Sequence, residues 1–182
     1  MDQYKVDNQY KPDQYKPDPG KPDQCKPDFK PDFKPDPKCP CHQCDKYRER
    51  LEESIQDEIC DAGFYAQIAN EAPTDILREL TTSIVGDEYG HARLQAALLG
   101  ICPPPESCPP HCPPATGHFE VDVKAAISGE LGAIRRYAEL AGCAPTLEIR
   151  YLLTSILGDE YAHARIWNAM LLAHSICASP CK

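Results

Sequence analysis

A twelve-residue segment occurs twice in this chain, 72 positions apart. The copy at 82–93 reads TSIVGDEYGHAR and the copy at 154–165 reads TSILGDEYAHAR, so ten of the twelve residues are identical. Each copy contains Glu-x-x-His, and each is preceded by Ala-Pro-Thr, at 72–74 and 144–146. A match of this length is hard to obtain by chance, and it predicts two copies of one structural unit.

The prolines separate helical from non-helical stretches. Of 19 prolines, nine lie in residues 1–40 and seven in residues 103–114. The intervening stretches carry apolar residues at helical spacing, which predicts helices at about 45–70, 74–100, 118–141 and 146–176. Two helical hairpins joined by a Pro- and Cys-rich linker at 101–117 predict an all-α fold, a four-helix bundle of the ferritin-like type over residues 45–182.

Residues 1–44 differ in character from the rest of the chain. They repeat Lys-Pro-Asp with a short spacer and end in a cysteine cluster at 39–44. Proline at every fourth or fifth position supports neither a helix nor a core, so we expect a disordered or polyproline-II-like arm. Eight Lys balance eight Asp in residues 1–38, so the formal charge of −9 belongs to residues 39–182.

Charge and hydropathy exclude several classes of function. An acidic domain disfavours a nucleic-acid partner and suits the binding of cations. No apolar run reaches the roughly 18 to 20 residues of a membrane span, and the first residues lack the apolar segment of a signal peptide. We therefore expect a cytoplasmic protein that binds neither nucleic acid nor a membrane.

Along each predicted helix, apolar residues recur every three or four positions and so form one face that would point into the bundle. At one height along the bundle, a glutamate or a Glu-x-x-His pair replaces the apolar residues of this face. The four interrupting glutamates each lie 15 residues from the proline of the nearest turn, which places their carboxylates at one level, about 22 Å from the turns. Burying carboxylates without partners is too costly, so four of them predict a site for two cations. Oxygen-rich ligation with one imidazole per metal suits iron or manganese. The predicted metal ligands are Glu58, Glu88, His91, Glu130, Glu160 and His163.

With these residues, the stretch 45–176 resembles the rubrerythrin branch of the ferritin-like superfamily. The resemblance implies two iron ions per chain, with manganese as the alternative. It also implies that Glu58 and Glu130 act as single-helix ligands beside the two Glu-x-x-His pairs, and that one carboxylate bridges the metals. The implied activity is that of a non-haem di-iron oxidoreductase that reduces hydrogen peroxide or dioxygen in oxidative-stress defence, with electrons from an external donor.

Four further residues are expected next to the ligands. Asp87 and Asp159 each precede a ligand glutamate, and across a bundle such an acid can accept the outer N–H of the facing histidine. Tyr65 and Tyr137 lie on the inward ridges, two turns from the single glutamates. We expect them to pack in the core beside the centre, with a hydrogen bond to a metal-bound oxygen species as the alternative.

The cysteines number 11 and gather mostly in the arm, the linker and the last residues. In a reducing compartment such clusters favour metal binding or redox chemistry over a disulfide framework. Cross-linking between chains and a disulfide between Cys177 and Cys181 are the alternatives. Cys60, two residues after Glu58, is expected to be a buried small side chain.

Three other functions fit the same residues. The chain could be an iron-binding or storage protein of the ferritin-like type, which oxidises Fe(II) as cargo. It could be a manganese-catalase-like enzyme, which needs no electron donor. It could also be a metal-binding structural coat protein, cross-linked through its arm and cysteines. For any of these we expect a homo-oligomer, with a dimer as the simplest form.

Overall fold

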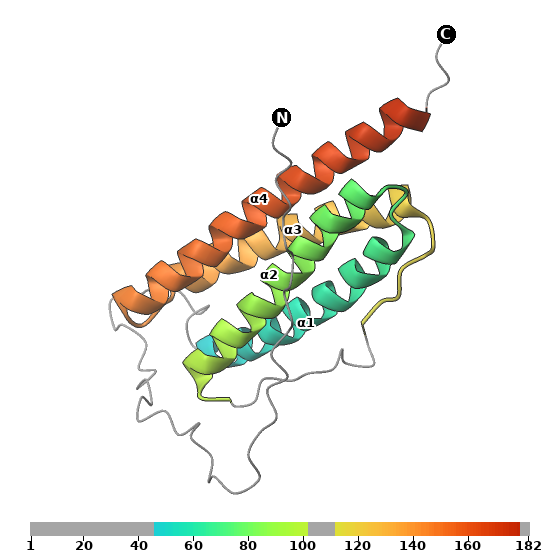
Figure 1. Cartoon of the computed structure of the whole chain (residues 1–182). Helices are drawn as coiled ribbons and strands as arrows, with labels where there is room; N and C mark the ends of the chain where they lie inside the picture. The colour runs from blue at the N-terminus through green and yellow to red at the C-terminus, as the bar shows by residue number, and fades with distance from the viewer. Residues whose placement is uncertain (1–45, 102–111, 179–182) are drawn as a thin grey trace, which may run out of the picture.

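A computed structural model of the chain describes residues 46–101 and 112–178 (Figure 1). Within these residues the chain forms four helices and no strand, which confirms the all-α four-helix bundle. The helices are α1 (Tyr47–Glu71), α2 (Asp75–Leu99), α3 (Phe119–Gly142) and α4 (Leu147–Ala178). The predicted arm at 1–44 and most of the linker lie outside the described residues.

The two hairpin turns use the same local chemistry. Thr74 caps α2, because its hydroxyl oxygen accepts a hydrogen bond of 3.3 Å from the backbone N–H of Leu77. Thr146 does the same for Ile149 at the start of α4, also at 3.3 Å. Such a cap satisfies one of the free N–H groups of the first helical turn. The repeated Pro-Thr sequence therefore ends one helix and begins the next in both hairpins.

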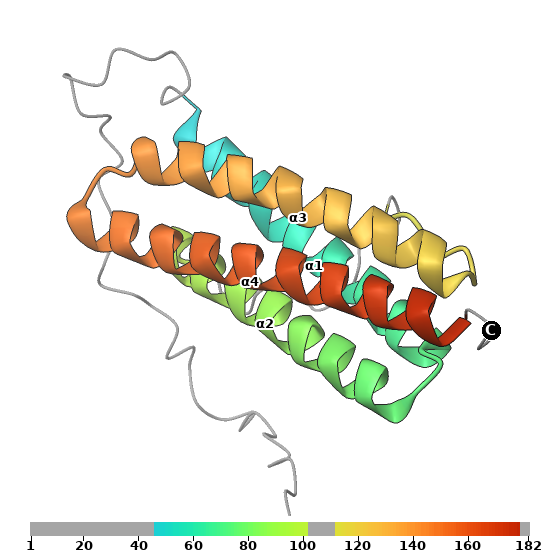
Figure 2. The same cartoon turned by 90° about the horizontal axis from the view of Figure 1, so that it is seen from above.

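The two hairpins lie against each other so that all four helices share one interior (Figure 2). α1 packs mainly on α2, and α3 mainly on α4, while α1 meets α3 and α2 meets α4 across the hairpins. The buried apolar residues form two clusters, one containing Leu51, Ile55 and Leu153 and the other containing Tyr65, Ile68 and Trp167. These clusters lie toward opposite ends of the bundle and leave the polar layer between them.

A disulfide attaches the end of the linker to α1. Cys60 is bonded to Cys112, 52 residues away in the chain. The backbone N–H of Ala115 then donates to the side-chain oxygen of Gln67 at 3.1 Å, which holds the following residues against the same helix. Cys60 is buried, as expected, but it is half of a disulfide that the sequence analysis did not predict. Its partner, Cys112, follows a Pro-rich stretch, and helical spacing predicts no contact for such a position.

Cys143 is also disulfide-bonded. Together with the Cys60–Cys112 bond, this contradicts the expectation that the cysteines favour metal binding or redox chemistry over disulfides for these positions. The alternative disulfide between Cys177 and Cys181 involves a residue outside the described part of the chain. Among the described helices, none combines the length and apolar character that crossing a membrane requires.

Candidate metal centre

The six predicted ligands lie together in the polar layer of the bundle. Each of the four helices contributes one glutamate, and α2 and α4 each add a histidine one turn further along. All six side chains are buried, with exposed fractions between 1% and 4%. Glu and His three residues apart share one face of a helix, which is why both side chains of each pair point inward. These six predicted ligands are Glu58, Glu88, His91, Glu130, Glu160 and His163.

These side chains form two groups that can each hold a metal ion. The first group is Glu58, Glu88, His91 and Glu160, and the second is Glu88, Glu130, Glu160 and His163. Within each group the ligand atoms lie within 4.8 Å of one another. An ion with bonds of about 2.1 Å places opposite ligands about 4.2 Å apart, so the groups need only a small contraction to close on an ion.

Glu88 and Glu160 belong to both groups. The sequence predicted one bridging carboxylate without identifying it, and the geometry makes both Glu-x-x-His glutamates candidates for that position. Glu58 and Glu130 each belong to one group only. The two groups are thus related by the internal repeat, each with a carboxylate of its own and an imidazole of its own.

Both histidines turn the same nitrogen toward the carboxylates. Nδ1 of His91 lies 3.1 Å from Glu160 Oε1 and 3.4 Å from Glu58 Oε2. Nδ1 of His163 lies 3.0 Å from Glu88 Oε1 and 3.6 Å from Glu160 Oε2. Neither Nδ1 atom has a hydrogen-bond partner of good geometry within the described residues. Two unpartnered imidazole nitrogens aimed at unpartnered carboxylate oxygens are the arrangement that a cation would complete.

The opposite nitrogen of each ring contacts an aspartate of the other hairpin. His91 Nε2 lies 3.4 Å from Asp159 Oδ2, and His163 Nε2 lies 3.3 Å from Asp87 Oδ2. Both aspartates are 56% exposed, whereas the histidines are almost fully buried. An acceptor on Nε2 keeps the proton there and leaves the Nδ1 lone pair free for a metal.

The two inward tyrosines lie beside the carboxylate layer in the core. The hydroxyl of Tyr137 donates a short hydrogen bond to Glu58 Oε1. Tyr65 is buried on the opposite side of the layer, where burial and the charges of Asp61 and Glu130 raise the pKa of its phenol well above the usual value. Tyr137 also accepts a hydrogen bond of 2.7 Å from the side-chain amide of Gln95. Both rings lie in the core, and the hydroxyl of Tyr137 binds a predicted ligand directly.

In the metal-free protein, protonated histidines neutralise part of the negative charge of the carboxylates. Burial by itself lowers the pKa of His163, but the nearby Glu160 and Glu88 carboxylates outweigh burial and raise this pKa to about 11. Burial likewise opposes protonation of His91, and its contacts with Glu160 and Glu58 raise its pKa well above the ordinary value. Both imidazoles are therefore protonated in the metal-free protein at neutral pH.

The glutamates divide into two protonated and two ionised carboxyls. Burial, together with the neighbouring Glu160, raises the pKa of Glu130 to about 10. Burial also raises the pKa of Glu58 well above its usual range. Burial opposes ionisation of Glu160 too, but the histidines more than offset it and lower its pKa to about 2. Like charges at this distance cannot all remain ionised.

Sequence reasoning missed three residues near the centre. Asp61 lies one turn after Glu58 on α1, and burial together with the Glu88 charge raises its pKa to about 7. Trp167 donates its indole N–H to Glu130 Oε1 at 2.9 Å. Gln95 stands at the corresponding place in the first repeat. Asp61 could have been found from its Glu-x-x-Asp spacing, whereas the two hydrogen-bond donors look like ordinary ridge residues.

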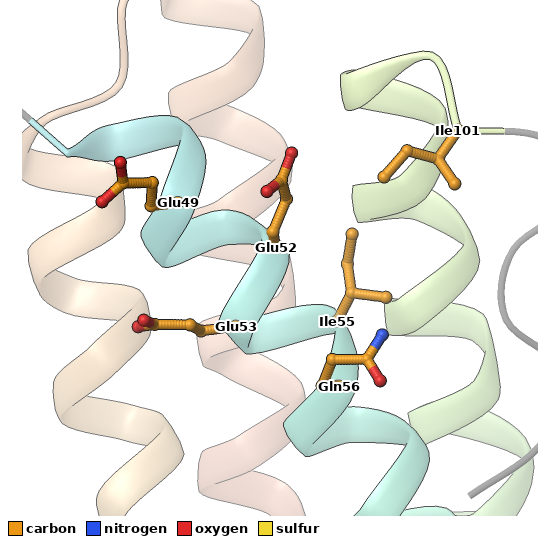
Figure 3. A pocket seen from close by; sticks show the side chains of 6 residues that line it. All are labelled: Glu49, Glu52, Glu53, Ile55, Gln56 and Ile101. Carbon is orange, nitrogen blue, oxygen red and sulfur yellow. The ribbon is translucent and has the colours of Figure 1, made fainter. Parts of the chain in front are cut away.

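A surface pocket lies near one end of the molecule, between the start of α1 and the end of α2 (Figure 3). Glu49 and Glu53 point to the side away from α2, while Ile55 lies between the two helices. Glu52 pairs with Arg48 at 3.0 Å, and Glu49 with Lys46 at 3.6 Å. These are solvated acids in surface ion pairs, which distinguishes this pocket from the buried centre.

Comparison of the chain with protein-family models, with curated proteins and with solved structures gives no match. The functional argument therefore depends on the chemistry of the buried groups.

Proposed function

We propose that this protein is a di-iron carboxylate oxidoreductase that reduces hydrogen peroxide or dioxygen with electrons from an external donor. The observation that carries the proposal is the pair of buried ligand groups that share Glu88 and Glu160. Carboxylate-rich groups with one imidazole each suit iron and manganese better than structural zinc. The rubrerythrin resemblance of residues 45–176 supports iron and supports one ion in each group.

The bound metals would supply the redox chemistry, with Fe(II) oxidised to Fe(III) as the oxidant is reduced. Glu58 and Glu130 would each help to hold the ion of one group, and Glu88 and Glu160, which belong to both groups, would help to hold either ion. Asp87 and Asp159 hold the histidine rings with Nδ1 directed inward. Tyr137 holds a proton on its hydroxyl beside Glu58, since burial raises the pKa of the phenol well above its usual value.

The apolar clusters above and below the layer limit the access of water. The fully buried side chains on the two sides include Leu51, Ile55 and Leu153 on one side and Tyr65 and Trp167 on the other. In such surroundings a charged intermediate is held by fixed protein groups and is protected from side reactions. This environment favours a small oxidant such as peroxide or dioxygen over a bulky substrate.

The proposal predicts fast and repeated oxidation by peroxide. Iron-loaded, fully reduced protein should be oxidised by stoichiometric hydrogen peroxide much faster than by air, and it should cycle when a reductant is supplied. Glu130→Ala is expected to abolish turnover, because it removes one of the few ligands of its group. Glu120→Ala, at an exposed position of the same helix, is the matched control and should retain turnover. Stopped-flow absorbance measures both.

Other outcomes of the same experiment would contradict the proposal and indicate a different function. A single oxidation followed by release of ferric mineral would indicate iron storage. Oxygen evolution from peroxide without a donor would indicate a manganese-catalase-like reaction. Cross-linked assemblies with no redox turnover would indicate a structural coat protein.

A further inference from the structure

The outward face of α4 carries a row of large apolar side chains, each between 55% and 67% exposed. At 3.6 residues per turn, their positions fall within about 80° of one another, on the side of the helix opposite Glu160 and His163. α4 therefore has an apolar face that the described residues leave uncovered, in addition to the face that it turns to the core. This row, called the outer stripe below, consists of Leu147, Tyr151, Tyr161, Leu172 and Ile176.

The internal repeat shows that the bundle does not require this stripe. Under the 72-residue offset, Leu147 corresponds to Asp75 and Tyr151 corresponds to Glu79, so the same face of α2 begins with two acids. α2 also ends at Leu99, before the positions that would match the last two residues of the stripe. The corresponding turns of α4 project beyond the neighbouring helices (Figure 1). An exposed apolar row that one copy of the repeat has and the other lacks indicates a contact outside the bundle.

The outer stripe has the same spacing when it is read from either end. Tyr151 follows Leu147 by four residues, and Ile176 follows Leu172 by four residues. In an antiparallel pair of α4 helices related by a two-fold axis, Leu147 of one copy lies at the height of Ile176 of the other. Tyr151 then lies at the height of Leu172, and Tyr161 lies next to the axis. Such a two-fold pairing brings every large apolar residue of the stripe to the surface of its counterpart.

The middle of the stripe fits the same pairing. Arg165, which interrupts the row with a charge, comes to the height of Gly158 of the other copy. A side chain built at Gly158 would meet no atom within 4 Å, so the space above this glycine can receive the arginine side chain. No two like charges face each other along the row. The stripe is therefore complementary to itself in both size and charge.

We propose that the outer stripe is the docking surface for a second copy of this chain, with the two α4 helices packed antiparallel about a two-fold axis. From position 147 to position 176 the stripe covers about 44 Å of helix. A contact over this length has room for the roughly 800 Å² per partner that a stable dimer buries. The inference goes beyond the proposed function and does not depend on it, because no residue of the stripe belongs to a candidate ligand group.

The first test measures the mass of the full-length protein by sedimentation equilibrium over the micromolar range. A dimer with twice the chain mass of 20.2 kDa is expected. Leu147→Asp/Tyr151→Glu, which gives α4 the acids that α2 has at these positions, is expected to raise the dissociation constant at least about 100-fold. Ile76→Glu, at an exposed apolar position of α2, is the matched control and should leave the dissociation constant unchanged. Both variants should keep the helical content of the wild type, because the replaced side chains are exposed.

The second test determines the direction of the pairing. Tyr151 is replaced by the photo-reactive p-benzoylphenylalanine, and isotope-labelled and unlabelled chains are mixed before irradiation. Mass spectrometry is expected to find position 151 of one chain attached to a peptide of the other chain that contains Leu172. Attachment to the region of position 151 in the other chain would indicate a parallel pair and would overturn the proposal.

Three further outcomes would also overturn the proposal. One is a wild-type protein that is monomeric over the whole concentration range. Another is a dimer that Leu147→Asp/Tyr151→Glu does not weaken, including a dimer held by disulfides between chains. The third is a cross-link from position 151 that never joins two chains. If the double variant does not fold, the cross-link alone decides between the antiparallel pair and these alternatives.

Discussion

Asp87 and Asp159 occupy an unusual position for residues that influence a buried centre, because both are more than half exposed. Each contacts the outer nitrogen of a histidine that belongs to the other hairpin, at 3.3 Å and 3.4 Å. When a cation replaces the proton on Nδ1, this contact would keep the other proton on Nε2 and hold the ring with Nδ1 directed inward. A surface carboxylate can therefore control the affinity of the centre without being a ligand.

Asp87→Asn is expected to weaken iron affinity by about 10- to 100-fold, because the amide accepts the His163 N–H less strongly and can present a donor instead. Titration of the metal-free protein with Fe(II) under anaerobic conditions measures the change. Glu79→Gln removes an exposed acid from the same helix and controls for the loss of one negative charge. Equal affinities for the two variants would contradict the role of Asp87 in orienting His163.

The end of the linker that follows α2 is attached to the bundle close to the level of the candidate metal centre. Its last residues are attached to α1 by the Cys60–Cys112 bond, and Thr116 is held at the start of α3 because its N–H and hydroxyl donate to the buried Asp122 carboxylate. These contacts close a loop of about 52 residues between α1 and the start of the second hairpin. Closing a long loop lowers the entropy of the unfolded chain, which stabilises the folded bundle.

Cys60→Ser/Cys112→Ser is expected to lower the free energy of unfolding by about 2–4 kcal/mol, the usual contribution of a disulfide that closes a loop of this length. Iron content should not change, because neither ligand group among the described residues includes a cysteine. Urea unfolding under oxidising conditions measures the difference. Under a reductant that opens the bond, wild-type and variant proteins should unfold at the same urea concentration. A persistent difference there would assign the effect to packing of the side chains.

The bundle as a whole is built around a layer of acidic side chains whose charge, without a metal, is balanced by bound protons. In the metal-free protein, protons bound to Glu58, Glu130 and the two histidines neutralise charge that bound cations would otherwise neutralise. The pKa values of Glu130 and His163 are raised above their ordinary values of 4.5 and 6.5, to about 10 and about 11. The folded protein therefore binds more protons than the unfolded chain over the range between these values.

It follows that the metal-free protein should lose stability as pH rises. A raised folded-state pKa contributes stability below the unfolded value, and this contribution is lost as pH rises through the folded value. The melting temperature of metal-free protein should fall steadily from pH 6 toward pH 10. The melting temperature of Glu130→Gln should fall less steeply with pH, because glutamine stays neutral over the whole range. Thermal unfolding followed by circular dichroism tests this, and a melting temperature that rises over the range would contradict the charge balance described for the layer.

Local features of the sequence were sufficient for the helices and for the six residues that gather in the candidate centre. The predicted helix at 74–100 is observed as Asp75–Leu99, and the one at 118–141 as Phe119–Gly142. Proline positions, threonine caps and the 3.6-residue period act within a few residues of the chain, so they can be read directly from it. Equal distances from the two turns then place the glutamates at one level, as the structure has them.

Only the tertiary structure decided which groups meet across the bundle. It makes Glu88 and Glu160 common to both candidate ligand groups and brings the indole N–H of Trp167 to Glu130. It also joins Cys60 to Cys112. These contacts depend on the relative rotation and offset of helices that are distant in sequence, which the packing of the whole core sets. No local pattern contains that information.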